Sequence, residues 1–221
     1  MAGTVKHRKE AVDTEPLSGT KIKKKSTARE YFEAIVIAIL LALFIRTFVV
    51  QAFKIPSGSM KPTLLVGDHI LVNKFIYGVK LPFTDKTLIK VRLPERGDVI
   101  VFKYPRDPSK DYIKRVIGLP GDQVQLVNNK LYLNGKPVPD PHAFYGNSPY
   151  SGSGLLRNFG PVVVPAGHLF VMGDNRNESA DSRVWGFVPM SYVRGKAFLI
   201  YWSWDHDHFG VRWRRMGDII H

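Results

Sequence analysis

The chain has no cysteine among its 221 residues. This absence excludes disulfide bonds, thiol nucleophiles and zinc–thiolate sites, and it leaves the redox compartment open. A folded part outside the cytoplasm would therefore depend on its core alone. Hydrophobic residues make up 44% of the chain, which is enough for such a core and argues against wholesale disorder. The length suits one domain, or one domain with a small insert.

Acidic residues are in the minority, and the formal net charge is +13. Such a charge is typical of proteins that bind nucleic acid or an anionic membrane. The sequence has no recognition-helix pattern, zinc-finger spacing or aromatic nucleic-acid motif, so we expect no nucleic-acid partner. Much of the charge lies in the N-terminal tail, at Lys6, Arg8, Lys9, Lys21, Lys23, Lys24, Lys25 and Arg29. We interpret this tail as a solvated segment that orients a membrane anchor next to lipid.

One largely apolar run extends from Ala34 to Phe53, and Arg46 is its only charged residue. This is about the 20 residues that a membrane-spanning helix needs, and Arg46 can reach the interface with its long side chain. The sequence therefore predicts a transmembrane helix over residues 34–53. The alternative is a cleaved signal peptide, but no small-residue cleavage pattern follows Arg46.

The topology follows from the positive flank of this run. Positively charged flanks stay in the cytoplasm, so residues 1–33 are predicted to be a cytoplasmic tail. Residues 54–221 are then an extracytoplasmic domain, and the protein is a single-pass protein of the cell inner (cytoplasmic) membrane.

The sequence after Ile55 favours β-structure. Short β-branched or aromatic runs alternate with Gly, Pro, Asn and Asp. Asn128-Asn129 and Asn134-Gly135 are signals for tight turns. The runs are at residues 69–74, 98–102, 123–127, 130–133, 162–164 and 168–172. We predict a mainly β, antiparallel catalytic body with a small inserted β subdomain at about residues 123–165.

A serine follows the apolar run at once, in the turn Pro56-Ser57-Gly58-Ser59-Met60. Ser59 is either a turn residue or a nucleophile, and a serine nucleophile needs a base. No histidine lies in a triad context, and there is no Gly-x-Ser-x-Gly elbow. The Asp205–His208 cluster lacks a third spaced metal ligand, so we expect neither a metal nor any other cofactor.

Lysine can be the base if apolar surroundings keep it neutral. Lys114 lies between Ile113 and Val116 on a predicted strand, although simple alternation would turn it toward solvent. A polar loop at residues 173–183 could support it. There Asp181 and Arg183 can form an ion pair, and Ser179 and Ser182 could orient an amine. A calcium site is the poorer interpretation of this loop, because the spacing of an EF-hand is missing.

Four segments together resemble bacterial type I signal peptidases, which are membrane-bound serine proteases that remove signal peptides from exported proteins. They occur in the order of that family. The segments are Pro56-Ser57-Gly58-Ser59-Met60-Lys61-Pro62-Thr63-Leu64, residues 96–102, residues 111–122, and residues 173–189 with Gly173-Asp174-Asn175-Arg176 and Ser179-x-Asp181-Ser182-Arg183.

The resemblance implies a role for each matching residue. Ser59 would be the nucleophile, Lys114 its general base, Ser57 an oxyanion donor, and Ser179 the residue that orients the amine. Asp181 and Arg183, supported by Asp174, would be a structural pair behind the site. Shallow pockets for small side chains, as in Ala-x-Ala sites of preprotein signal peptides, would be lined by Phe53, Ile55, Met60, Leu64, Ile70, Val101, Tyr112 and Ile113. The resemblance further suggests a monomer.

Two other functions are compatible with parts of the sequence. A self-cleaving repressor would also use serine and lysine, but it would carry a DNA-binding module, and none is recognisable here. A membrane-anchored β adaptor would bind anionic lipid or an acidic partner through a basic face, without catalysis. In that case Ser59 and Lys114 would be dispensable.

Overall fold

A computed structural model describes residues 27–80, 87–89, 91–146 and 154–221. The chain divides into two compact units, Met1–Leu40 and Leu41–His221, and the described strands all belong to the second. The basic tail through residue 26 lies outside the described residues.

The apolar run is not one helix. Helix α1 (Thr27–Phe44) continues as a π-helical turn η1 (Ile45–Val49), and strand β1 (Val50–Lys54) follows. The prediction of a helix as far as Phe53 is therefore wrong after Val49. Val50 takes extended dihedral angles, and β1 pairs antiparallel with β2 (Asp68–Asn73), which satisfies its backbone without a helix. Among the described residues, no helix has the length and apolar character needed to cross a membrane.

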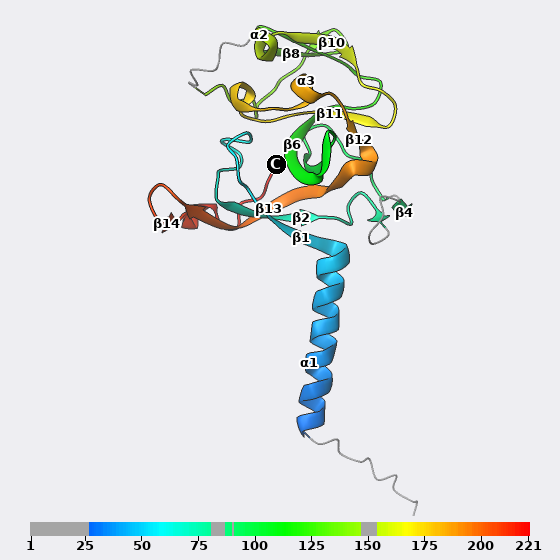
Figure 1. Ribbon diagram of the computed structural model, residues 1–221, viewed down its shortest axis with the longest axis vertical. Helices are drawn as coiled ribbons and strands as arrows, with labels where there is room; N and C mark the ends of the chain where they lie inside the picture. Colours follow the sequence, from blue (N-terminus) through cyan, green and yellow to red (C-terminus); the bar gives the residue numbers. More distant parts are fainter. Residues whose placement is uncertain (1–26, 81–86, 90, 147–153) are drawn as a thin grey trace, which may run out of the picture. The chain divides into compact units, whose positions relative to one another are not determined.

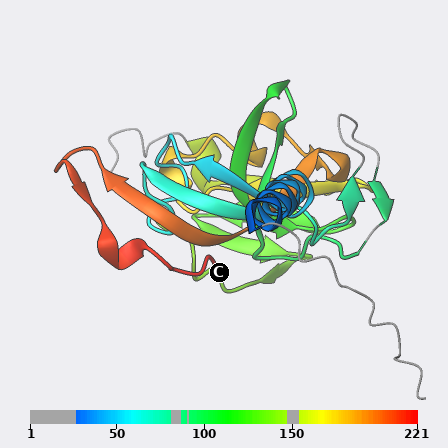
Figure 2. The ribbon, with the colours of Figure 1, turned by 90° about the horizontal axis from the view of Figure 1, so that it is seen from below.

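The main antiparallel sheet has eight strands within the described residues, in the order β1-β2-β13-β5-β6-β11-β12, with β14 paired to β13 (Figure 1). Figure 2 shows β13, in orange, running out to the red β14. The remaining strands are β5 (Val99–Tyr104), β6 (Asp107–Gly118), β11 (His168–Met172), β12 (Val188–Pro189), β13 (Val193–Asp205) and β14 (Gly210–Val211).

A second, small sheet has the order β10-β7-β8-β9 and comes from the segment predicted to form an insert. Its strands are β7 (Gln123–Val127), β8 (Lys130–Leu133), β9 (Lys136–Pro137) and β10 (Phe159–Val163). Both predicted hairpin turns are confirmed. Asn128 and Asn129 have positive φ angles of 48° and 69°, as do Asn134 and Gly135 at 53° and 75°, which is the geometry of two-residue hairpins.

The other described elements are short. They are the ribbon of β3 (Val79–Lys80) and β4 (Thr87–Ile89), helices α2 (Gly154–Arg157) and α3 (Ser182–Trp185), and the 3₁₀ turns η2 (Arg176–Glu178), η3 (Met190–Tyr192) and η4 (Trp213–Arg215).

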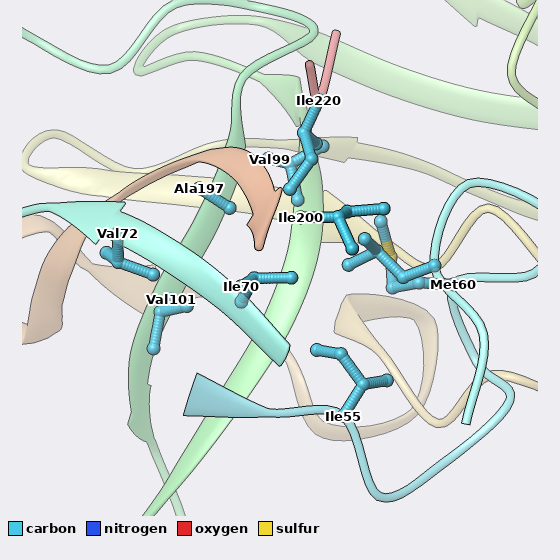
Figure 3. Packing of buried hydrophobic residues seen from close by; sticks show 10 residues of the cluster. Ile55, Met60, Ile70, Val72, Val99, Val101, Ala197, Ile200 and Ile220 are labelled. Carbon is cyan, nitrogen blue, oxygen red and sulfur yellow. The ribbon is translucent and has the colours of Figure 1, made fainter. Parts of the chain in front are cut away.

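One apolar cluster lies directly beneath the Ser59 turn. Met60 and Leu64 are fully buried in it, together with side chains from β2, β5 and β13 (Figure 3). Full burial of such a side chain contributes roughly 1.5–3 kcal/mol. Two buried side chains within five residues therefore hold the turn against the sheet.

Candidate active site

Ser59 lies in the connection between β1 and β2. The ends of this connection are tied by hydrogen bonds between Ile55 and Asp68 (2.8 Å) and between Gly67 and Ile55 (3.0 Å). The carbonyl of Ser59 accepts a hydrogen bond from the Asn175 amide at 3.1 Å. These bonds, with the buried Met60 beside it, fix the backbone of Ser59, whose side chain is largely buried at 9% exposure.

Lys114 is buried rather than turned to solvent. The second half of β6 is a central part of the sheet, paired with β5 and β11. Every residue from Lys114 to Gly118 is buried, and since successive side chains point to opposite faces, both faces of the strand are covered there. The lysine Nζ donates to Ser59 Oγ at 2.7 Å and to the Ile113 carbonyl at 2.8 Å. Ser59 and Lys114, 55 residues apart in sequence, are thus in direct contact.

The electrostatic surroundings favour a neutral amine. Burial lowers the pKa of Lys114 to about 8, while the carboxylates of Asp181 and Asp174 act in the opposite direction and raise it. Desolvation wins because the ammonium loses its hydration and no carboxylate touches it. About a tenth of Lys114 is therefore uncharged at pH 7 and about half at pH 8, and this fraction can accept a proton.

Ser179 does not make the hydrogen bond to Lys114 that the resemblance implies. Its Oγ is buried and has no hydrogen-bond partner in the part of the chain that the structure describes, while the amine donates to Ser59 and Ile113 instead. Ser179 packs against Gly173. A Cβ at Gly173 would lie 2.3 Å from Ser179 Oγ and 2.4 Å from the Ser59 carbonyl oxygen. Only glycine allows the two chain segments to approach so closely.

Asp181 and Arg183 form the expected ion pair, with contacts of 2.9 and 2.8 Å. Asp181 also accepts from the Gly173 amide at 3.0 Å, so the pair holds the backbone next to Ser179. Asp174, however, does not join this pair. Both of its carboxylate oxygens bind Arg115, at 2.8 and 2.7 Å, and one also accepts from Thr63 at 2.6 Å.

A cleft of about 430 Å³ opens at the contact between Ser59 and Lys114. It is lined by Pro56, Ser57, Gly58, Ser59, Asp111, Tyr112, Ile113, Lys114, Glu178 and Ala180. Ser57 is exposed at its wall.

The predicted pocket residues separate into two groups. Tyr112 and Ile113 line this cleft. Ile55, Met60, Leu64, Ile70 and Val101 are instead core residues with at most 2% exposure, and Phe53 packs against the same cluster. They form the layer beneath the Ser59 turn because they point to the inner face of the sheet. Sequence similarity alone does not distinguish a residue that lines a pocket from one that supports it.

Three residues support the site although the sequence does not indicate their roles. Arg115 is buried and bridges Asp174 to the carbonyls of Gly97 and His221. Arg176 has no exposed surface and forms a bidentate pair with Asp140 of the insert. Both arginines fall within the matched segments, and a buried arginine needs a partner. The position of these arginines in the matched segments indicated that they matter, but the sequence does not show which residues they pair with.

Asn175 is the third such residue. Its side-chain nitrogen donates to the Gly58 carbonyl at 3.2 Å and to Glu178 at 2.8 Å, while its amide holds Ser59. Asn175 therefore joins the polar loop to the serine turn through both its side chain and its backbone amide.

A serine hydroxyl held against a buried, partly neutral amine at the floor of a cleft is typical of hydrolases that use serine and lysine. The profile of the family described as Signal peptidase, peptidase S26 matches residues 28–202. A signal peptidase I of Pseudomonas fluorescens is 44% identical over 83% of this chain and 76% of its own length. One from Pseudomonas aeruginosa is 41% identical, over 87% and 78%.

A crystal structure of a signal peptidase I from Enterococcus faecalis aligns with 48% of this chain and 97% of its own, with 33% identity and a TM-score of 0.39. The family match and the two Pseudomonas relatives cover most of the chain. The chain belongs to the signal peptidase family, peptidase S26, and is a serine peptidase.

Proposed function

We propose that the chain removes N-terminal signal peptides from exported preproteins, with Ser59 as nucleophile and Lys114 as general base. The observation that carries the proposal is the 2.7 Å contact between Lys114 Nζ and Ser59 Oγ, buried at the end of a cleft. The relatives named signal peptidase I support the substrate class.

The reaction begins with the neutral amine of Lys114. It takes the proton of Ser59 as Oγ attacks the scissile carbonyl carbon, and the resulting oxyanion is bound by the Ser59 amide and the Ser57 hydroxyl. The protonated amine then gives its proton to the leaving amino group, and the peptide bond breaks. Water, activated in the same way, releases the acyl group from Ser59. No cofactor takes part.

Cleavage follows small residues of the Ala-x-Ala type. Tyr112 and Ile113 line the cleft beside Ser59, while the buried layer that includes Ile55 and Met60 supports its floor. A shallow apolar surface of this kind accepts alanine and leaves little room for larger side chains.

A membrane anchor is the second part of the proposal. Helix α1 has no buried residue, and it exposes apolar side chains such as Ile37 (65%) and Leu40 (61%). Large exposed apolar surfaces are typical of membrane or protein contacts. With the N-terminal tail in the cytoplasm, the anchor would hold the catalytic unit outside, and it would raise the effective concentration of a membrane-bound preprotein. The enzyme acts as a monomer.

Cleavage of a preprotein with an Ala-x-Ala site tests the function. Purified full-length protein in lipid or detergent should cut it after the second alanine, whereas Ser59→Ala and Lys114→Ala should show no measurable turnover. Wild-type kcat/KM should fall about tenfold per pH unit below about pH 8, because protonated Lys114 cannot accept a proton.

The adaptor function makes the opposite prediction. Folded wild-type protein would leave the preprotein intact, or Ser59→Ala would cleave it as well as wild type does. Either result would exclude the proposed chemistry. Sedimentation with membranes after an alkaline wash tests the anchor separately, and a variant that lacks residues 1–49 should stay in the supernatant.

A further inference from the structure

We propose that Glu178 gives the substrate cleft a charge preference, favouring a basic and disfavouring an acidic substrate residue beside the scissile bond. The inference rests on the proposed function, since it concerns the residues that flank the cut. In the proposed function, apolar pockets select small side chains. Glu178 would be a further specificity-determining residue, and it would select by charge.

Glu178 is held in place on the cleft wall. It ends the 3₁₀ turn η2 and lines the cleft together with Ser59 and Lys114. Its Oε2 accepts from the side-chain nitrogen of Asn175 at 2.8 Å, and the same nitrogen donates to the Gly58 carbonyl. Because Asn175 is only 1% exposed, this link fixes the carboxylate relative to the turn that carries Ser59.

The negative charge of Glu178 is not compensated locally. The cleft has two acidic lining residues, Asp111 and Glu178, and one basic one, Lys114. Asp111 forms an ion pair with Arg194 at 3.2 Å. Lys114 is charged in most molecules below about pH 8, but it is neutral in the reactive form of the enzyme, whose kcat/KM is measured. Within residues 27–80, 87–89, 91–146 and 154–221, Glu178 has no ion-pair partner, so the reactive cleft presents one unpaired carboxylate.

A bound peptide offers two positions that can meet this charge. Successive side chains of an extended chain point to opposite sides. Small residues one and three places before the cut occupy the apolar pockets, so the residue between them points elsewhere. The first residue after the cut is equally free of those pockets. A lysine at either position could pair with Glu178, and a glutamate would be repelled.

The expected size is modest because Glu178 is exposed to solvent. Exposed ion pairs correspond to at most about a fivefold change in an equilibrium constant, and they weaken with salt. We therefore expect about a threefold to fivefold higher kcat/KM for a lysine peptide than for a glutamine peptide, and a similar step down to glutamate.

The experiment uses matched peptides with Lys, Gln or Glu at x of Ala-x-Ala, and a second set varied at the first residue after the cut. Ratios of kcat/KM are measured for the full-length wild type, Glu178→Gln and Glu178→Lys. Glutamine keeps the acceptor for Asn175 and removes only the charge. The Lys-to-Glu ratio should approach one in Glu178→Gln, invert in Glu178→Lys, and shrink in wild type at high salt.

Two control variants separate Glu178 from general charge effects. Asp111→Asn removes the other carboxylate of the cleft, which is already paired, and Asp207→Asn removes an exposed one from the β13–β14 loop. Both should keep a clear preference for lysine. The proposal is overturned if wild type cleaves the Lys and Gln peptides with kcat/KM values within twofold of each other at both positions. It is also overturned if Glu178→Lys does not invert the Lys-to-Glu ratio. The proposed function survives either result. If no peptide is cut at all, both proposals fail together.

Discussion

The small sheet buries apolar side chains, whereas the interior behind Ser59 buries ions. Val124, Leu126, Leu131 and Leu133 pack with side chains from β6 and β11 and need no polar partner. Around Ser59 the chain buries charged side chains in addition to the apolar cluster beneath the turn; they are Lys114, Arg115, Asp174, Arg176, Asp181 and Arg183. These two regions belong to the same compact unit, so the difference is not one of size or position in the chain.

The comparison shows what each interior is for. The burial of apolar side chains stabilises the fold, but it is non-directional and does not fix the orientation of individual groups. Buried ion pairs contribute little net stability, because desolvation offsets their attraction, but they impose fixed geometry. Asp174 fixes Thr63 and Arg115, and Asp181 fixes Gly173 and Arg183. The region around Ser59 and Lys114 therefore contains interactions that add little stability but fix the positions of these two residues.

Asp174→Asn should have the largest effect on folding. It leaves Arg115 buried without its anionic partner, and breaking such a pair costs about 4 kcal/mol in the free energy of unfolding. Urea unfolding of the full chain in detergent measures this, with the exposed Asp207→Asn as control. A loss of less than about 1 kcal/mol in the free energy of unfolding would mean that the buried ion pair is no more sensitive to substitution than an ordinary site.

Ser57→Ala should separate catalysis from folding. Removal of an oxyanion donor lowers the rate by about 100–1000-fold, which corresponds to about 3–4 kcal/mol in the barrier. Since Ser57 is exposed, the free energy of unfolding should change by no more than about 0.5 kcal/mol. Single-turnover cleavage and urea unfolding of the same preparation test both parts. A loss below tenfold would assign Ser57 to the turn alone.

Leu126→Ala should give the reverse pattern in the small sheet. Leu126 is 1% exposed, and its truncation leaves a cavity that costs about 3 kcal/mol. The kcat/KM of the folded enzyme should stay within about twofold of wild type, because no ion near Ser59 is disturbed. A matched drop in kcat/KM under strongly native conditions would show that the two interiors are coupled.

The fold was largely accessible from sequence because strands and turns leave local signals. The asparagine turns at Asn128-Asn129 and Asn134-Gly135 formed as expected, and the runs around β2, β7, β8 and β11 are strands. The end of the apolar run was not accessible. Thr47 to Phe53 are equally compatible with a helix and with a strand, and the partner strand β2 decides between them.

The site was accessible as a set of residues but not as a set of contacts. Sequence patterns named Ser59 and Lys114, but only the structure shows that both faces of β6 are covered from Lys114 onward, so that Lys114 is buried. The partner of Asp174 proved to be Arg115 rather than the Asp181–Arg183 pair, and Ser179 packs on Gly173 without binding the amine. Such pairings depend on strand register, which single-residue patterns do not encode.

Lys114→Met should abolish cleavage and yet stabilise the protein, which is the finest test of the comparison. The pKa of Lys114 is lowered to about 8 in the folded state, so the unfolded chain binds more protons between about pH 8 and the ordinary lysine pKa of 10.5. Wild-type stability should therefore rise with pH across this window, and below it the charged amine weakens the fold.

Removal of the amine at pH 7 relieves the desolvation of the charged group but also removes its hydrogen bonds to Ser59 and Ile113. The net result should be a rise of about 1–3 kcal/mol in the free energy of unfolding. Unfolding at pH 7 and pH 10 measures the gain and its decline, with the exposed Lys130→Met as control. Destabilisation at pH 7 would mean that the hydrogen bonds of Lys114 outweigh its desolvation, so that the buried ions of the catalytic region would support the fold as the apolar residues do.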